Sequence, residues 1–223
     1  MHVLLVNPNT TASMTAAIAA SAAAVAAPDT VVEAVNPDQG PPSIENDDDE
    51  RRCVPGLLDE IAAAAARSRQ RPDAYVVACF GDPGMEQARA LVDAPVLGIA
   101  QAAMHAAALL AGTFSVVTSM SATVPRGWEL ARLHTPRACL GVHACDIPVV
   151  RIDADPASLG PIAELCAAAL SGDGSRAIVL GCAAMARYAE PLRRRLGVPV
   201  IDGVQAATLL AQSLAPLAAP GGN

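Results

Sequence analysis

The stretch Ala177–Cys182 (AIVLGC) repeats the character of Ala74–Cys79 (AYVVAC): an apolar run rich in β-branched residues that ends in a cysteine. Each copy continues in the same order, with a helical stretch, a Pro-Val pair and a Gln-Ala-Ala triplet. From the cysteine to the glutamine the interval is 22 residues in the first copy and 23 in the second. This shared order indicates an internal repeat, so we predict two related halves of about 100 residues each.

Outside the repeat, short β-branched runs alternate with longer Ala-rich segments along the chain. This alternation predicts parallel sheets with crossover helices, and the unbroken apolar runs indicate strands that are covered on both faces. The predicted strands are His2–Val6, Thr30–Val35, Ala74–Cys79, Val96–Leu97, Ser115–Thr118, Val149–Ile152, Arg176–Leu180 and Val198–Ile201. The predicted helices lie near residues 11–26, 48–68, 84–92, 100–111, 157–171, 184–196 and 203–214.

We therefore expect an α/β fold with two pseudo-symmetric lobes, each a mostly parallel sheet flanked by helices. Lobe 1 comprises residues 1–98 and 204–223 in this prediction, and lobe 2 comprises residues 99–203. Open α/β sheets bind ligands beyond the carboxyl ends of their strands. The active site is accordingly expected in the cleft between the two lobes.

Composition excludes several classes of function. The net charge is −7 and no basic block is present, which argues against a nucleic acid partner. All 15 basic residues are arginine, so no lysine is available for Schiff-base or P-loop chemistry. No signal-peptide or membrane-spanning pattern is found, so we expect a cytoplasmic protein without membrane contact, whose six cysteines are free thiols.

Two cysteines at equivalent strand ends suggest acid–base chemistry at one carbon atom. Cys79 and Cys182 each precede a helical stretch, whose N–H groups and dipole are expected to lower the thiol pKa below its free value of about 8.5. A thiolate there can remove a proton from a stereocentre while the opposite thiol donates a proton to the other face. This pairing of equal residues at equivalent sites predicts a racemase.

The carbanion of such a step needs an adjacent carbonyl group and N–H donors for its developing oxyanion. The turns Phe80–Asp82 and Gly181–Ala184 expose backbone amides beside the two cysteines. Asn9, Thr118 and Ser119 follow the first strand of each half and are expected to supply further donors to a neutral ligand.

Six short motifs, in their order and spacing, resemble those of a known family. They are VNPNT at 6–10, GPPSIE at 40–45, ACFGDPG at 78–84, VVT at 116–118, LGCAAM at 180–185 and VIDGV at 200–204. On these motifs the chain resembles the aspartate/glutamate racemase superfamily and, within it, the hydantoin/allantoin racemase family. The resemblance runs from residue 2 to about residue 210 and so covers nearly the whole chain.

The resemblance implies cofactor-independent racemisation of 5-monosubstituted hydantoins such as allantoin, with Cys79 and Cys182 as the two acid–base residues. The residues that it implies for substrate binding are Asn9, Ile44, Phe80, Gly81, Thr118, Ser119, Gly181 and Ala183. The implied partners are a small-molecule substrate and further copies of the chain, as a tetramer or hexamer. The preferred C5 substituent is not predicted.

One departure from the wider superfamily concerns the substrate. Glutamate racemases carry Thr-His directly after the second cysteine, whereas Ala183 and Ala184 stand there in this chain. Neither cysteine turn has an arginine close by in the sequence to bind a carboxylate. Both features favour a neutral cyclic imide over an amino acid. The alternatives are an aspartate- or glutamate-type racemase, a related one-thiol carbon–carbon lyase and a non-catalytic small-molecule binding protein.

Other polar and sulfur-bearing residues are expected to have structural roles. The spacing of Cys139, His143 and Cys145 matches no common zinc pattern, so no metal site is predicted. The acidic run at 47–50 is expected to be a solvated helix start, with Cys53 beside it more exposed than the other cysteines. The preceding loop, 40–45, is expected to close over the ligand.

Overall fold

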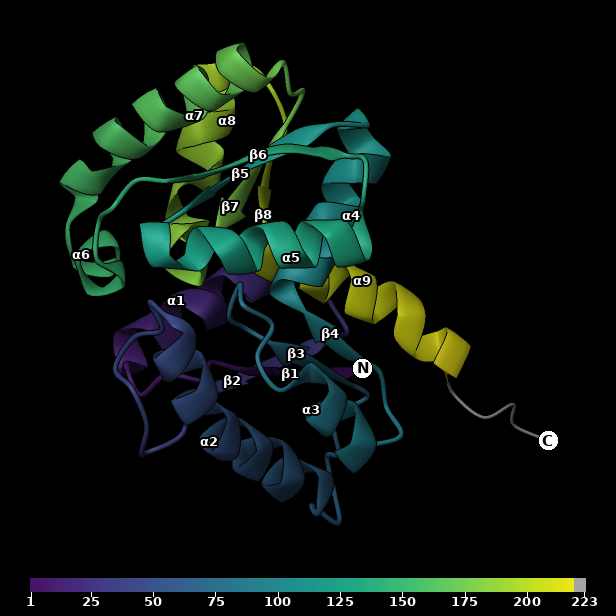
Figure 1. Ribbon diagram of the computed structural model, residues 1–223. Coiled ribbons are helices and arrows are strands. Elements are labelled where there is room, and N and C mark those ends of the chain that lie inside the picture. Colours follow the sequence, from purple (N-terminus) through teal and green to yellow (C-terminus); the bar gives the residue numbers. More distant parts are fainter. Residues whose placement is uncertain (219–223) are drawn as a thin grey trace.

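The computed structural model describes residues 1–218, which form two lobes that each contain a four-stranded parallel sheet (Figure 1). The strand order is β2-β1-β3-β4 in the first sheet and β6-β5-β7-β8 in the second. The strands are β1 (His2–Val6), β2 (Val31–Val35), β3 (Ala74–Val77), β4 (Val96–Gly98), β5 (Phe114–Thr118), β6 (Cys139–Ala144), β7 (Ile178–Gly181) and β8 (Val200–Asp202). Counted within its own lobe, each sheet has the strand order 2-1-3-4. The predicted α/β fold with two pseudo-symmetric lobes is therefore confirmed.

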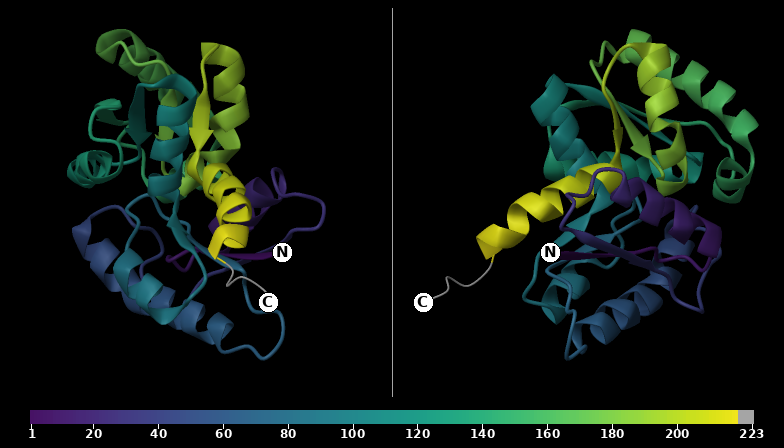
Figure 2. Two further views of the ribbon diagram at one scale, coloured as in Figure 1. Left: turned by 90° about the vertical axis from the view of Figure 1, so that its right-hand side faces the viewer. Right: turned by 180° about the vertical axis from the view of Figure 1, so that it is seen from behind.

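Helices lie on both faces of each sheet, as the apolar strands require (Figure 2). The α-helices are α1 (Ala12–Ala23), α2 (Asp47–Ala65), α3 (Met85–Leu91), α4 (Ile99–Ala111), α5 (Val124–His134), α6 (Val149–Ala154), α7 (Leu159–Asp173), α8 (Ala189–Leu196) and α9 (Gly203–Ala218). Three 3-10 helices, η1 (Ser121–Thr123), η2 (Pro156–Ser158) and η3 (Ala183–Tyr188), complete the described part of the chain.

The two lobes share one apolar core, which lies between the sheets and includes α4 and α9. Val76 of the first sheet and Val116 of the second both belong to it. At the start of α9 a side chain on Gly203 would come 2.7 Å from the Ile99 carbonyl oxygen, so the two helices approach each other closely only because this residue is glycine. Since α4 begins where β4 ends and α9 begins where β8 ends, this contact brings the carboxyl ends of the two sheets opposite each other.

One predicted strand is wrong, and the structure shows why. Val149–Ile152 begins helix α6, in which Val149 and Ile152 are buried at helical spacing directly after Pro148. The fourth strand of the second sheet is instead β6, whose glycine and histidine weaken the β-branched pattern of a strand. Helix α5 was also not predicted from the sequence, because Pro125 and Gly127 interrupt its helical pattern.

Within residues 1–218 no helix combines the length and the apolar character needed to cross a bilayer. We propose the lobe boundaries 1–98 with 204–223 and 99–203, at the starts of α4 and α9. Residues 219–223 of the first lobe lie outside the described part of the chain.

Candidate active site

The ends of four strands converge on one cavity between the lobes. β1 pairs with β3 as far as Val6 and Val77, and β5 pairs with β7 as far as Thr118 and Gly181. The segments that follow these strand ends form much of the cavity wall. All ten residues that the sequence suggested as site residues line it: Asn9, Ile44, Cys79, Phe80, Gly81, Thr118, Ser119, Gly181, Cys182 and Ala183.

Cys79 lies in a turn and not directly at the start of a helix. Helix α3 begins only at Met85, and Asp82 within the intervening turn adopts a φ of 46°. Burial raises the pKa of the Cys79 thiol well above its ordinary value, and the nearby Cys53 thiol and Glu50 carboxyl raise it further. The Gly81 amide is the one group that lowers it by a hydrogen bond.

Cys182 is the N-cap residue of η3, with extended backbone angles. Burial raises the pKa of its thiol to about 11. The amides of Ala184 and Met185 and the Ser119 hydroxyl lower this pKa by hydrogen bonding, but burial outweighs them. The expected lowering of both thiol pKa values below the free value is therefore wrong, because in both turns loss of solvation is the largest effect.

An asparagine network after β1 orients one predicted donor. Asn7 donates to the side-chain oxygen of Asn9 at 3.0 Å, and this oxygen also accepts the Thr11 amide at 2.9 Å. The amide nitrogen of Asn9 is left with only a weak contact to the Met14 sulfur at 3.4 Å. The Asn9 side chain therefore has N–H groups to offer to a ligand in the cavity.

The hydroxyl groups after β5 are less free. Thr118 donates to the Gly181 carbonyl oxygen at 3.0 Å, which ties β5 to β7 at the cavity wall. Its single proton is thus engaged within the protein, and towards a ligand this hydroxyl can act as an acceptor. Ser119 interacts with Cys182 through its hydroxyl and accepts the Cys145 thiol through its carbonyl oxygen at 3.6 Å.

The loop 40–45 lies against the cavity and contacts the other lobe. Ile44 lines the cavity, as expected for a loop that covers the ligand. Glu45 accepts the amide of Val149, the first residue of α6, at 2.8 Å. Since Val149 also lines the cavity, this hydrogen bond closes one side of it.

Two charged residues of the cavity wall were missed by sequence reasoning, Glu50 and Arg126. Arg126 comes from α5 and donates two hydrogen bonds to the Gly81 carbonyl oxygen, at 3.0 and 2.9 Å. The expectation that no arginine lies near a cysteine turn is therefore wrong. No local sequence signal points to this contact, because 45 residues separate its partners.

Glu50 is not part of a solvated helix start, as had been expected. Its side chain is only 18% exposed, and burial raises the pKa of its carboxyl group to about 7. A signal for this burial is present in the sequence, since Glu50 precedes the buried residues Cys53, Leu57 and Ile61 of α2 at helical spacing. Cys53, expected to be more exposed, is itself buried on this face of α2.

Comparisons with known proteins show the family of this chain. A family model described as Asp/Glu/Hydantoin racemase matches residues 3–211. The chain belongs to this family. The resemblance seen in its six motifs is confirmed, and it extends over nearly all of the described residues of this racemase-family member.

Individual members of the family are also similar over the full chain. The hydantoin racemase of Rhizobium meliloti is 44% identical over 216 residues, which cover 96% of this chain and 88% of that protein. The hydantoin racemase of Paenarthrobacter aurescens is 37% identical over 219 residues, which cover 97% and 92%. The solved structure of allantoin racemase from Klebsiella pneumoniae matches with a TM-score of 0.93 at 43% identity, covering 97% of this chain and 88% of that one.

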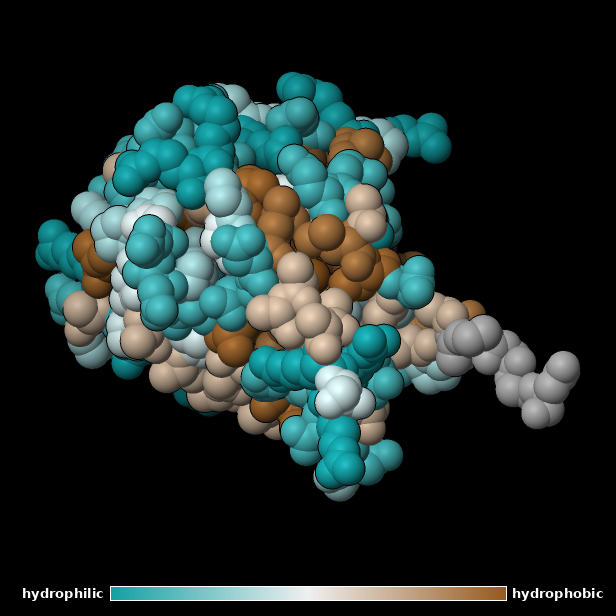
Figure 3. Space-filling view, turned by 90° about the horizontal axis from the view of Figure 1, so that it is seen from below, coloured by the Kyte–Doolittle hydropathy of each residue, from teal (hydrophilic) through white to brown (hydrophobic). Residues whose placement is uncertain are grey.

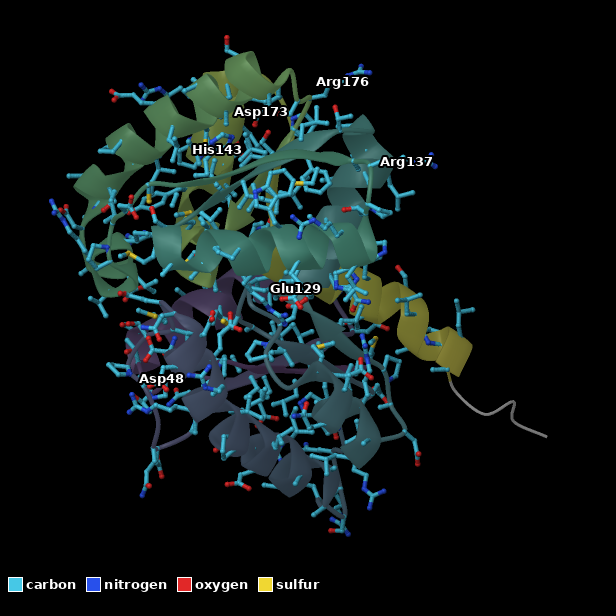
Figure 4. The ribbon with its side chains drawn as sticks, viewed as in Figure 1. Asp48, Glu129, Arg137, His143, Asp173 and Arg176 are labelled. Atoms are coloured by element: carbon cyan, nitrogen blue, oxygen red, sulfur yellow. The ribbon has the colours of Figure 1, made fainter. Side chains whose placement is uncertain are left out.

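In this member of the racemase family, His143 is not among the residues that line the cavity. Its Nε2 is 2.7 Å from the Asp173 carboxylate, near the end of the second lobe that faces away from the first (Figure 4). Within residues 1–218 no group of three His, Cys, Asp or Glu side chains is arranged to hold a metal ion. Cys139 is the first residue of β6 and Cys145 directly follows that strand, and both are partly buried.

Proposed function

We propose that this protein racemises 5-monosubstituted hydantoins, allantoin among them, by proton transfer between Cys79, the C5 carbon and Cys182. The proposal draws its substrate class from the relatives, which are named hydantoin racemases and allantoin racemase. The single observation that supports the mechanism is the presence of both cysteines, each from an equivalent turn of its lobe, in the wall of one cavity. Binding alone would need neither thiol.

The chemical step needs one thiolate and one thiol. The thiolate takes the proton from C5, and the electron pair of the C–H bond passes into the enolate formed with the adjacent ring carbonyl. The opposite thiol then donates its proton to the other face of C5 and becomes the thiolate. The total proton count is unchanged, and the two cysteines have exchanged protonation states.

Backbone and side-chain donors stabilise the enolate. The amides beside the cysteine turns and the Asn9 side chain are the donors that the cavity offers to ring carbonyl groups. One well-placed donor of this kind contributes on the order of 3 kcal/mol to the stability of a developing oxyanion.

We propose that the reaction uses no cofactor. The enolate intermediate is formed by removal of a proton and needs no electron sink beyond the ring carbonyl. The chain has no lysine with which to form a Schiff base.

One observation favours a second candidate, an aspartate- or glutamate-type racemase. Arg126 lines the cavity, and an arginine there is the usual partner of a substrate carboxylate. Three of its N–H donors are already used, however, two for the Gly81 carbonyl oxygen and one for Glu129 at 2.7 Å. Because Arg126 is committed to these partners, the neutral hydantoin remains our first choice.

A substrate panel tests the function directly. Enantiopure 5-alkyl hydantoins, allantoin and aspartate are incubated separately with the protein in buffer that contains EDTA and no cofactor, and optical rotation is followed. We expect the rotation of the hydantoins to decay, with deuterium from D2O entering C5. Activity on aspartate alone would favour the amino-acid racemase, and activity on none of the substrates would favour the binding protein.

We also propose that the protein is a cytoplasmic homo-oligomer, a tetramer or hexamer as the family resemblance implies. Support for association comes from α9, which projects from the body of the molecule and carries the exposed residues Leu209, Leu214 and Leu217. Viewed from below, apolar side chains gather on the side from which this helix projects (Figure 3). Exposed apolar surface of this kind is typical of interfaces between protein chains.

A further inference from the structure

The carboxyl group of Glu50 lines the catalytic cavity and accepts no hydrogen bond from the described residues of the protein. Its closest charged neighbour is Arg126, whose Nε lies 3.7 Å from Oε2, beyond hydrogen-bond distance. Among residues 1–218 no group donates a hydrogen bond to the Glu50 side chain, of which 18% is exposed. The oxygens of this carboxyl group therefore keep lone pairs that can accept hydrogen bonds.

The Glu50 carboxyl group lies against the Cys79 turn. It packs so closely on Gly81 that a β-carbon there would come within 2.1 Å of Oε1. The guanidinium group of Arg126 donates its hydrogen bonds to the Gly81 carbonyl oxygen and to Glu129, and not to Glu50. Figure 4 shows Glu129 on the side of α5 that faces the first lobe. The carboxyl group of Glu50 is therefore available to a ligand that brings its own N–H groups.

Glu50 is also the only carboxyl group in the described wall of the catalytic cavity. The other polar side chains of that wall are amides, hydroxyl groups and Arg126. These groups include donors suited to the ring carbonyl groups, whereas the ionised form of Glu50 only accepts hydrogen bonds. A ureido substituent at C5 carries several N–H groups, and an alkyl substituent carries none.

The position of Glu50 suits a substituent more than the ring. Glu50 and Arg126 line the catalytic cavity and also a second, polar groove outside it, bounded by Asp47, Pro83 and Glu129. Glu50 thus stands where the cavity meets this groove.

From this geometry we propose that Glu50 determines substrate specificity by accepting N–H groups of a ureido substituent at C5, so that the protein prefers allantoin to 5-alkyl hydantoins. The inference rests on the hydantoin racemase activity proposed above. It goes beyond that activity by naming a residue that distinguishes one hydantoin substrate from another.

The test compares two substrates in three variants. We would measure kcat/KM for allantoin and for 5-isopropylhydantoin with the wild-type protein, Glu50→Leu and Glu50→Gln. A hydrogen bond to a charged group is worth about a tenfold change or more in binding. Because Glu50 also affects the Cys79 thiol, a change common to both substrates is possible in any variant, and the ratio of the two kcat/KM values is the readout. Glu50→Leu is therefore expected to lower the allantoin to 5-isopropylhydantoin ratio of kcat/KM about tenfold or more. Glu50→Gln retains one acceptor oxygen and is expected to show a smaller selective loss.

Glu129→Gln is the matched control, because Glu129 also pairs with Arg126 but lines only the outer groove. It is expected to leave the ratio of the two kcat/KM values unchanged. Equal losses on both substrates in Glu50→Leu, or no loss on either, would overturn the inference. If Glu50→Leu fails to fold, the ratio in Glu50→Gln decides between these outcomes. Failure of the proposed function is distinct, because the wild-type protein would then racemise neither hydantoin.

Discussion

The two cysteine turns occupy equivalent positions in the two lobes, yet they surround their sulfur atoms with different groups. Cys182 caps a 3-10 helix and is approached by two amides and the Ser119 hydroxyl. Cys79 lies in an open turn with one amide, beside the Cys53 thiol and the Glu50 carboxyl group. Burial dominates in both turns. Around Cys182 the three donors favour the charged form and only the Cys145 thiol disfavours it. Around Cys79 one amide favours the charged form, and the Cys53 and Glu50 groups disfavour it.

This difference suggests how a nearly symmetric site starts its reaction. A two-base racemase needs one thiolate and one thiol, and equal environments would not decide which is which. Cys182 has more hydrogen-bond donors at its sulfur than Cys79, and these donors favour its ionisation. We therefore expect Cys182 to be the base and Cys79 the acid in the resting protein.

The largest effect is expected from replacing either cysteine by serine. Cys79→Ser and Cys182→Ser should each lower the racemisation rate by about 10²–10⁴-fold, because a hydroxyl group is too weak an acid and too weak a base for the lost proton transfer. Each variant should still exchange deuterium into one enantiomer, through its remaining cysteine. Cys79→Ser should exchange faster than Cys182→Ser, since it retains the more readily ionised thiol.

Optical rotation measures the racemisation, and mass spectrometry of the separated enantiomers measures the deuterium content. Cys139→Ser is the control, because Cys139 lies on β6 outside the cavity and should retain wild-type rates. Full racemisation by either single cysteine variant would contradict the two-base mechanism. Faster exchange by Cys182→Ser would reverse our assignment of base and acid.

A smaller effect is expected at the glycines beside the two cysteines. A β-carbon on Gly181 would lie 3.0 Å from the Thr118 Cα and 2.8 Å from its Cβ, and both atoms belong to the rigid strand β5. A β-carbon on Gly81 would meet the end of the Glu50 side chain, which can rotate away. Gly181→Ala should therefore lower the free energy of unfolding by about 1–3 kcal/mol, as overpacking does, and Gly81→Ala by about 1 kcal/mol or less.

Urea unfolding followed by circular dichroism gives both free energies. Gly160→Ala is a suitable reference, since a β-carbon there would have no neighbour within 4 Å. The comparison of the turns would be refuted by a larger loss in Gly81→Ala than in Gly181→Ala. That result would mean that the Cys79 turn is the more rigid of the two.

The two cysteine turns also show which features of the site could be predicted from the sequence and which could not. The repeat predicted both lobes and put the residues after the strand ends, such as Asn9 and Cys182, at one cavity, because parallel strands place their carboxyl ends on the same edge. It did not predict Arg126, since its approach to Gly81 depends on how α5 of one lobe lies against a turn of the other. Burial is likewise a property of the assembled fold, and for this reason the direction of the thiol pKa shifts was wrong.

The smallest expected effect is a difference in alkylation rate between the two thiols. Iodoacetamide reacts with the thiolate, so the rate at each cysteine follows its ionised fraction. Because the pKa of Cys182 is about 11 and that of Cys79 is raised well above its ordinary value, both rates should rise about tenfold per pH unit between pH 7 and 8.5. At any pH in this range Cys182 should react faster than Cys79.

Access to the cavity also affects such rates, so the comparison needs a variant that changes only ionisation. Ser119→Ala removes the hydroxyl that lowers the pKa of Cys182, and it should slow alkylation of Cys182 severalfold without slowing Cys79. Peptide mass spectrometry after partial labelling gives both rates in one sample. A plateau below pH 8.5 would mean that burial does not govern these thiols. Equal slowing of both cysteines in Ser119→Ala would trace the difference to access, and the donors around Cys182 would then not decide which thiol ionises first.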